Sequence, residues 1–372
     1  MTNTNHFKSI DQLRGIAILL VLASHTFAYA GVRYPAPIKE STLRSASKFL
    51  ECVFCQIFAN GFFGVMIFFV LSGFCIRWSH LNTKHFTWKN FYQRRIFRII
   101  PAYWTWLAIA AVIASAGACD FILHASLLHN VDKDTYLSIL PPLWSIAIEW
   151  QIYLLYPMIL LLASKFCRFH VLTFFALSNL ASSFLSSNPV ATFIHSDALK
   201  ILGRLPTALM FSWMLGFYLA DAQMAGTKVK CSPLLLCLYI FSGIATYIHS
   251  NTCFLASLPW SLAAYQLVGL FIGKGFHWPF VKVDLLAWIG IVSYSVYLSH
   301  DLFARCYPWI ERMLGIGRGS FLSGLTAFCV LILPMLLIGY LSYRFVEAPG
   351  IRLGKFLGSR FNPKSEVRKS IV

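Results

Sequence analysis

Ten apolar stretches of about the length of a membrane span constrain the fold of this chain more than any other feature. A helix that crosses a bilayer needs roughly 20 mostly apolar residues. Of the 372 residues, 58% are hydrophobic and only 12% are charged, whereas soluble domains carry about 25% charged residues. We therefore expect an all-α, polytopic membrane bundle of about ten transmembrane helices. The stretches lie near 13–30, 56–76, 99–116, 144–163, 171–187, 205–221, 233–249, 254–272, 286–300 and 319–341.

The basic residues predict how this bundle is oriented. An even number of spans puts both termini on one side of the membrane. With the termini inside, 21 of the 31 Lys and Arg residues fall on the cytoplasmic side and 10 on the outer side, as expected because short cytoplasmic loops are enriched in these residues. The sequence thus predicts cytoplasmic termini, a membrane domain over 1–345 and a short cytoplasmic tail over 346–372. The chain has a net charge of +17. We expect its basic residues to contact membrane lipid, and we expect no nucleic-acid partner.

Polar side chains within the apolar stretches are the candidates for chemistry. A charged residue at the centre of a spanning helix costs at least about 2.5 kcal/mol on insertion, so such residues usually face the bundle interior and often mark a site. His25 lies in the first stretch and Glu149 at the start of the fourth. For Glu149 the structural alternative is an ion pair with an arginine of the bundle.

Arg14 and His25 are eleven residues apart, which predicts that they share one helix face. Eleven residues at 100° each return to within about 20° of the same direction and rise roughly 16 Å along the axis. That face would present a cation near the cytoplasm and an imidazole deep in the membrane, which suits a long ligand with an anionic head and a reactive tail. The plainer alternative is a positive-inside anchor and a packing histidine.

Arg95 and Arg98 lie three residues apart in a stretch that leads into the third span. Side chains with this spacing are neighbours on a helix surface, and two guanidinium groups can bind phosphate oxygens in bidentate fashion. Anchoring to lipid headgroups is the alternative.

Six sequence segments resemble motifs of the membrane acyltransferase-3 family and follow one another in the family's order. The chain is similar to it over residues 9 to 350. The segments are SIDQLRGIAILLVLASH, NGFFGVMIFFVLSGFCI, RRIFRIIPAYW, LWSIAIEWQIYLLYP, VSYSVYLSH and YRFVEAPG.

The resemblance implies a multi-pass enzyme of the bacterial cytoplasmic (inner) membrane. It would transfer an acyl group, usually acetyl, from cytoplasmic acyl-CoA to a hydroxyl of a sugar, glycan or glycolipid, with acyl-CoA as a cosubstrate and no cofactor bound permanently. It assigns catalysis to His25 and Glu149. Arg95 and Arg98 would bind the phosphates of coenzyme A, and Arg14, the arginine that the family pairs with the histidine, would lie nearby in the same binding site.

The chain departs from the family pattern at Thr26, where many members carry an acidic residue directly after the histidine. We therefore expect Glu149 to hold the imidazole of His25 in place. His25 would act as a general base or carry the acyl group as an acyl-histidine. His300 and Ser72 are weaker candidates for substrate binding, since a histidine at a helix end also caps carbonyls and Ser72 with Gly73 also suits close helix packing.

Two other interpretations remain open. Intramembrane His and Glu residues with a basic inner face also suit a proton-coupled transporter or flippase of a lipid-linked sugar or small anion. His124 and His129, with Asp120 and Asp132 nearby, have no recognised metal-ligand spacing, and we expect no metal site.

Overall fold

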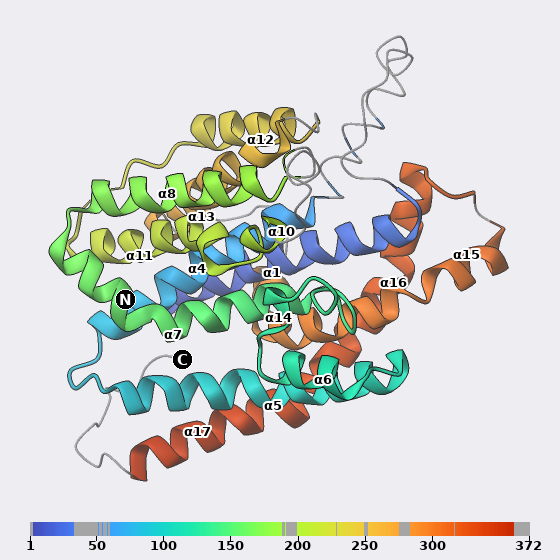
Figure 1. The fold of residues 1–372 in the computed structure, drawn as a ribbon, viewed down its shortest axis with the longest axis horizontal. Helices are drawn as coiled ribbons and strands as arrows, with labels where there is room; N and C mark the ends of the chain where they lie inside the picture. Colours follow the sequence, from blue (N-terminus) through green and yellow to red (C-terminus); the bar gives the residue numbers. More distant parts are fainter. Residues whose placement is uncertain are drawn as a thin grey trace.

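The computed structural model describes residues 3–32, 51, 54, 58, 60–187, 190, 199–227, 229–248, 252–274, 283–315 and 317–360. Over these residues the chain consists of helices and turns without any strand (Figure 1). The longer helices are α1 (Asn3–Tyr29), α4 (Gly61–Leu81), α5 (Trp88–Ala114), α7 (Leu143–Lys165), α8 (Arg168–Leu185), α11 (Met210–Met224), α12 (Pro233–Ile248), α13 (Ser257–Lys274), α14 (Val283–Ala304), α16 (Phe321–Ser342) and α17 (Ala348–Arg360). The shorter ones are α6 (Ala118–Ala125), α10 (Leu199–Leu202) and α15 (Tyr307–Leu314).

Each of the ten predicted stretches coincides with a helix, which confirms the all-α membrane bundle. Among the described residues, six helical segments are both long and apolar enough to cross a membrane. Helices α11 and α12 have 15 and 16 residues, which at 1.5 Å per residue is shorter than a hydrocarbon core of about 30 Å. The count of ten spans and the orientation of the termini therefore stay predictions. The six segments are Lys8–Tyr29, Gly61–Leu81, Trp88–Ala114, Leu143–Lys165, Cys253–Gly273 and Phe321–Gly358.

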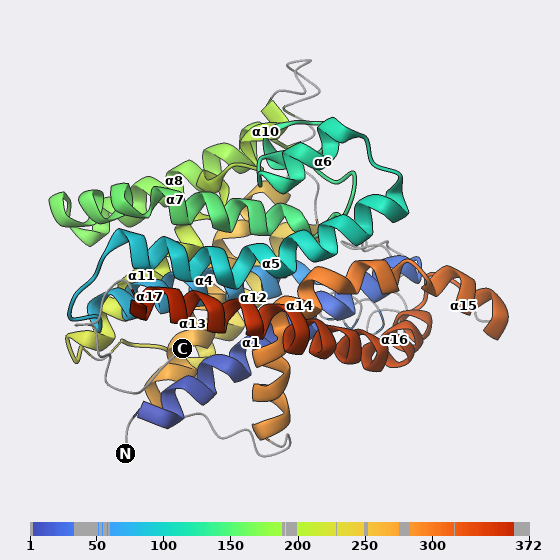
Figure 2. The same ribbon diagram turned by 90° about the horizontal axis from the view of Figure 1, so that it is seen from below.

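Helix α1, which carries Arg14 and His25, contacts four of the longer helices. It packs against α4, α13, α14 and α16 (Figure 2). Glycines make the contact with α14 very close: a Cβ atom at Gly15 would clash with the carbonyl oxygen of Leu286, and one at Gly290 with the carbonyl oxygen of Asp11. Small residues let helix backbones approach in this way. The close approach fixes the register between the two helices that build the site.

The second close contact joins α4 and α11. A Cβ atom at Gly73 would clash with the carbonyl oxygen of Trp213, and one at Gly216 with that of Val70. Gly73 therefore serves helix packing, which is the structural role considered for it in the sequence, whereas its neighbour Ser72 points into a cavity described below.

Helix α17 lies along α5, so residues 348–360 of the predicted tail are an ordered helix. A π-helical turn, Tyr343–Glu347, joins α16 to α17. Its last residue, Glu347, is buried and accepts a hydrogen bond from Ser295 of α14 at 2.7 Å. This contact ties the segment after α16 to the helix that faces α1.

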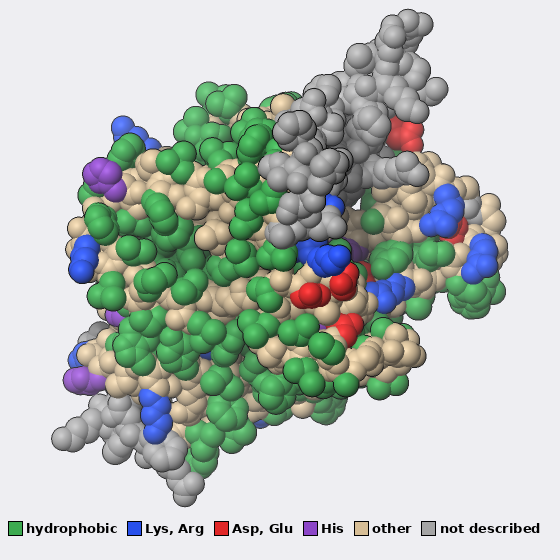
Figure 3. Space-filling view, viewed as in Figure 1, with side chains coloured by type: hydrophobic (Ala, Val, Ile, Leu, Met, Phe, Trp, Pro, Cys, Tyr) green, Lys and Arg blue, Asp and Glu red, His purple; other side chains and the backbone are tan. Residues whose placement is uncertain are grey.

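The outer surface matches a chain that sits in lipid. Hydrophobic side chains cover much of the face in Figure 3, most Lys, Arg and His side chains lie toward its left and right ends, and a group of acidic and basic side chains lies right of its middle. The start of α1 and the end of α17 lie at the same end (Figures 1 and 2).

Candidate active site

His25 contacts a buried carboxylate from the other end of the chain. Its Nδ1 lies 3.2 Å from Oδ1 of Asp301, in the last turn of α14. The Asp301 side chain is 2% exposed and the His25 side chain 30%. Because a carboxylate only accepts hydrogen bonds, Nδ1 carries a hydrogen in this contact, and in the neutral ring Nε2 then keeps its lone pair. The pair has the arrangement that orients a catalytic imidazole in hydrolytic triads.

Two further groups hold the Asp301 carboxylate. The hydroxyl of Tyr29 donates to Oδ1 at 3.2 Å, and Nε of Arg305 donates to Oδ2 at 2.9 Å. Arg305 also donates to the carbonyl oxygen of Ile139 at 3.3 Å, in the segment that leads into α7. The carboxylate is thus paired with a cation and hydrogen-bonded on both oxygens, as a buried charge requires.

The prediction that Glu149 holds the imidazole of His25 is wrong, because the carboxylate that contacts His25 Nδ1 is that of Asp301. The carboxylate of Glu149 instead accepts a hydrogen bond from the hydroxyl of Tyr153, one turn further along α7. The Tyr153 hydroxyl also pairs with Ser72 Oγ at 3.0 Å. Glu149, Tyr153 and Ser72 therefore form a hydrogen-bonded chain that joins α7 to α4.

His300 packs behind His25. Its ring is fully buried and meets the His25 ring edge to face, with 4.7 Å between centroids. Nδ1 of His300 donates to the carbonyl oxygen of Tyr297 at 2.7 Å, which is the capping contact considered from the sequence. The ring supports His25 from inside the bundle, and its role in acceptor binding stays a prediction.

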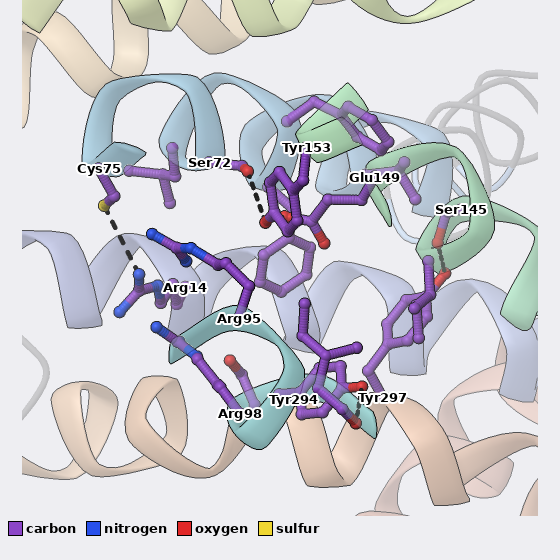
Figure 4. A pocket seen from close by; sticks show the side chains of 17 residues that line it. Arg14, Ser72, Cys75, Arg95, Arg98, Ser145, Glu149, Tyr153, Tyr294 and Tyr297 are labelled. Carbon is purple, nitrogen blue, oxygen red and sulfur yellow. Dashed lines mark hydrogen bonds between the residues drawn. The ribbon is translucent and has the colours of Figure 1, made fainter. Parts of the chain in front are cut away.

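The three predicted arginines meet at one cavity (Figure 4). Arg14 comes from α1, and Arg95 and Arg98 from α5. Arg14 contacts Asp11 at 3.1 Å and Cys75 Sγ at 3.6 Å, and the guanidinium group of Arg95 lies 5.3 Å from the ring centre of Tyr153. The cavity has about 870 Å³ of empty space, its open mouth included. Its polar lining is completed by Ser72, Ser145, Glu149, Tyr153, Ser293, Tyr294 and Tyr297.

The cavity follows the predicted face of α1 only in part. It reaches Arg14 but is not lined by His25. Its far end holds Tyr297 and Ser145, whose hydroxyl groups pair at 2.7 Å (Figure 4). The ring of Tyr297 lies 5.5 Å from that of His300, so Tyr297 stands between the cavity and the histidine pair.

A second cavity adjoins the first at the same two arginines, since Arg95 and Arg98 line both. It holds about 860 Å³ of empty space, open solvent included. Its lining adds cationic and aromatic groups to these arginines, namely His85, Phe86, Phe91, Arg94 and Lys355.

The sequence interpretation missed Asp301, Arg305, Tyr29 and Tyr297. A signal for Asp301 was present, because it directly follows the VSYSVYLSH segment. Since Thr26 stands where many family members have an acidic residue, the missing carboxylate could have been sought next to another histidine, and Asp301 follows His300 directly. No such signal identifies Tyr297, which is one of many tyrosines in the spans.

His124 and His129 form a separate buried pair, with stacked rings 4.0 Å apart. His124 Nδ1 lies 3.0 Å from Oδ1 of Asp120, while the two buried ring nitrogens of His129 have no hydrogen-bond partner among the described residues. Burial, reinforced by the nearby His124, lowers the pKa of His129 from 6.5 to about 3. Both rings therefore stay neutral at physiological pH.

This lowered pKa predicts a loss of stability in acid. Below pH 6.5 the unfolded chain binds a proton at His129 that the folded chain does not bind until about pH 3, so the free energy of unfolding falls with pH across this window, by about 2 kcal/mol at pH 5. We expect His129→Phe to flatten the pH dependence of Tm between pH 7 and pH 5, measured by thermal unfolding in detergent. His170→Phe, at an exposed position, is the control; equal slopes for the two variants would contradict the assignment.

Comparisons with known proteins identify the family to which this chain is similar. The family model for an acyltransferase domain matches residues 7–344. The chain is 25% identical over 395 residues to the peptidoglycan O-acetyltransferase OatA of Listeria monocytogenes, covering 94% of this chain and 56% of that protein. It is 26% identical over 354 residues to the O-acetyltransferase OatA of Staphylococcus aureus, covering 84% and 56%.

An uncharacterised protein of Haemophilus influenzae is 31% identical over 227 residues, which cover 51% of this chain and 92% of that protein. The chain thus spans about half the length of the O-acetyltransferases it matches. No solved structure matches.

Proposed function

We propose that this chain, which belongs to the acyltransferase-3 family, is a membrane O-acyltransferase that moves an acyl group from acyl-CoA to a hydroxyl of a cell-envelope glycan. The names of its relatives favour acetyl as the group and peptidoglycan as the first acceptor to test. The chain would lie in the bacterial cytoplasmic membrane with its arginine cavities toward the cytoplasm.

The pairing of His25 with Asp301 carries this proposal. A histidine in a membrane helix, held through Nδ1 by a carboxylate that is itself fixed by Arg305 and Tyr29, has the free Nε2 lone pair that a general base needs. The half-buried His25 ring leaves a face open to a substrate.

In the reaction, Nε2 of His25 takes the proton of the acceptor hydroxyl while the oxygen attacks the thioester carbonyl carbon. The C–O bond forms, the C–S bond breaks, and the imidazolium returns the proton to the leaving thiolate. Asp301 stabilises the transient imidazolium, as the aspartate does in a triad. A two-step route through an acyl-histidine uses the same groups and remains the alternative.

The two joined cavities supply a site for the donor. Arg14, Arg95 and Arg98 would bind its phosphates, because guanidinium groups form strong, bidentate hydrogen bonds with phosphate oxygens. The nucleotide would occupy the second cavity, among its cationic and aromatic side chains. The pantetheine arm would run along the first cavity, where Ser72, Tyr153 and Glu149 can hydrogen-bond its amides.

The decisive experiment measures thiol release. The chain, purified into nanodiscs, is given acetyl-CoA with or without soluble peptidoglycan fragments, and free thiol and base-labile acetyl esters are quantified. An acyltransferase releases one thiol for each ester formed. A carrier would bind or move its substrate without releasing thiol, and that outcome would refute the proposal.

We expect Arg98→Ala to weaken donor binding more than turnover. Loss of charged hydrogen bonds to phosphate costs about 1.5–3 kcal/mol, so KM for acetyl-CoA should rise roughly 10- to 100-fold while kcat falls less. The rise should shrink at high salt, which already screens the wild-type interaction. Arg352→Ala, at an exposed position of α17 that lines neither cavity, is the matched control. An unchanged KM in Arg98→Ala would exclude this phosphate site.

A further inference from the structure

Two rings in contact, those of Tyr297 and His300, connect the donor cavity to His25. Tyr297 lines the cavity, whereas His25, His300 and Asp301 do not. On its far side the Tyr297 ring contacts the ring of His300, which in turn packs on His25. A thioester that enters past the arginines therefore meets Tyr297 before it can meet the imidazole.

Tyr297 is held in this position by hydrogen bonds to the start of α7. Its hydroxyl donates to the carbonyl oxygen of Pro142 at 3.0 Å and pairs with Ser145 Oγ at 2.7 Å. The ring is 8% exposed and also packs against Phe68 of α4 at 6.3 Å. These contacts hold α14, α4 and α7 together at the end of the cavity, so the closure spans three helices.

We propose that Tyr297 is a gate residue that keeps the donor thioester from His25 until its hydroxyl leaves Ser145 and Pro142. The proposal rests on the acyltransferase function proposed above. The bonds that hold the gate are two hydrogen bonds to neutral groups, each of modest net strength, so substrate binding can displace them.

The gate would favour acyl transfer to the acceptor over hydrolysis of the donor by water, which the His25–Asp301 pair alone cannot do. A base that activates a sugar hydroxyl also activates water, and exclusion of water is what prevents hydrolysis of a reactive acyl donor. A closed Tyr297 limits this loss when no acceptor is bound. Loosening it should therefore increase hydrolysis, a gain that simple damage to the fold would not produce.

The test is the rate of thiol release from acetyl-CoA without any acceptor. Tyr297→Phe keeps the ring but removes both hydrogen bonds, and we expect roughly tenfold faster release than wild type. Ser145→Ala removes one partner and should give a smaller increase. Combining Tyr297→Phe with His25→Ala should abolish the increase, because the hydrolysis passes through His25.

The matched control is Tyr307→Phe, which removes one buried hydrogen bond, from the Tyr307 hydroxyl to the carbonyl oxygen of Ser323; neither residue lines either cavity. The gate is refuted if Tyr297→Phe releases thiol no faster than wild type, or if Tyr307→Phe or the double variant shows the same increase. Calorimetric titration with acetyl-CoA separates this failure from that of the proposed function. A wild-type chain that binds acetyl-CoA but shows no effect of Tyr297→Phe has no gate, whereas one that neither binds it nor releases thiol is not an acyltransferase.

Discussion

His25→Ala is expected to abolish acyl transfer while the chain still folds, inserts into the membrane and binds acetyl-CoA. General base catalysis alone contributes about 10² to 10⁴ in rate, and loss of the imidazole that contacts Asp301 should lower kcat at least about 10³-fold. The measurement is thiol release with acceptor, together with calorimetric binding of acetyl-CoA.

The control for this variant is His170→Ala, which removes an exposed histidine outside the site and should keep full activity. A His25→Ala chain within tenfold of wild type would remove His25 from catalysis. Isotope exchange then tells the two routes apart. Exchange of labelled CoA into acetyl-CoA without acceptor occurs only if an acyl-histidine forms.

Asp301→Asn is expected to cause the second large loss. The amide has nearly the shape of the carboxylate, but it neither stabilises an imidazolium by charge nor selects the Nδ1–H tautomer. The corresponding change in a serine protease triad lowers kcat about 10⁴-fold, and we expect a loss of 10³- to 10⁴-fold here. KM for acetyl-CoA should change little, since Asp301 does not line either cavity.

Glu149→Gln is the matched comparison, because it makes the same chemical change in the carboxylate that the sequence favoured. Glu149 lines the donor cavity, so its variant should chiefly raise KM for acetyl-CoA. A larger fall in kcat for Glu149→Gln than for Asp301→Asn would indicate that Glu149, and not Asp301, orients the imidazole of His25. Side-by-side kcat and KM values settle the comparison.

The helices could be predicted from the sequence because apolar character persists over each of them. Their lengths were less certain: the stretch at 205–221 has the composition of a span, yet α11 has only 15 helical residues. The convergence of Arg14, Arg95 and Arg98 was also predictable, since helix geometry fixes neighbours three residues apart and the family motifs point to one ligand.

The partner of His25 was not predictable in the same way. It depends on the register between α1 and α14, which the close contacts at Gly15 and Gly290 determine. The hydrophobic periodicity of a sequence does not indicate the register between two helices that are far apart in the chain. The position of Tyr297 at the end of the cavity depends on the packing of three helices and could not be predicted from the sequence either. The sequence favoured Glu149 because it is a carboxylate inside a predicted span, where a charged side chain raises the free energy of membrane insertion.

The separation of 276 positions between His25 and Asp301 in the sequence has a consequence for biosynthesis. The first helix leaves the ribosome long before α14 does, so an unfinished polypeptide carries the imidazole of His25 before it carries Asp301. On the function proposed here, such an intermediate would not yet consume the acyl donor. On that function, catalytic competence would begin only when α14 has packed against α1.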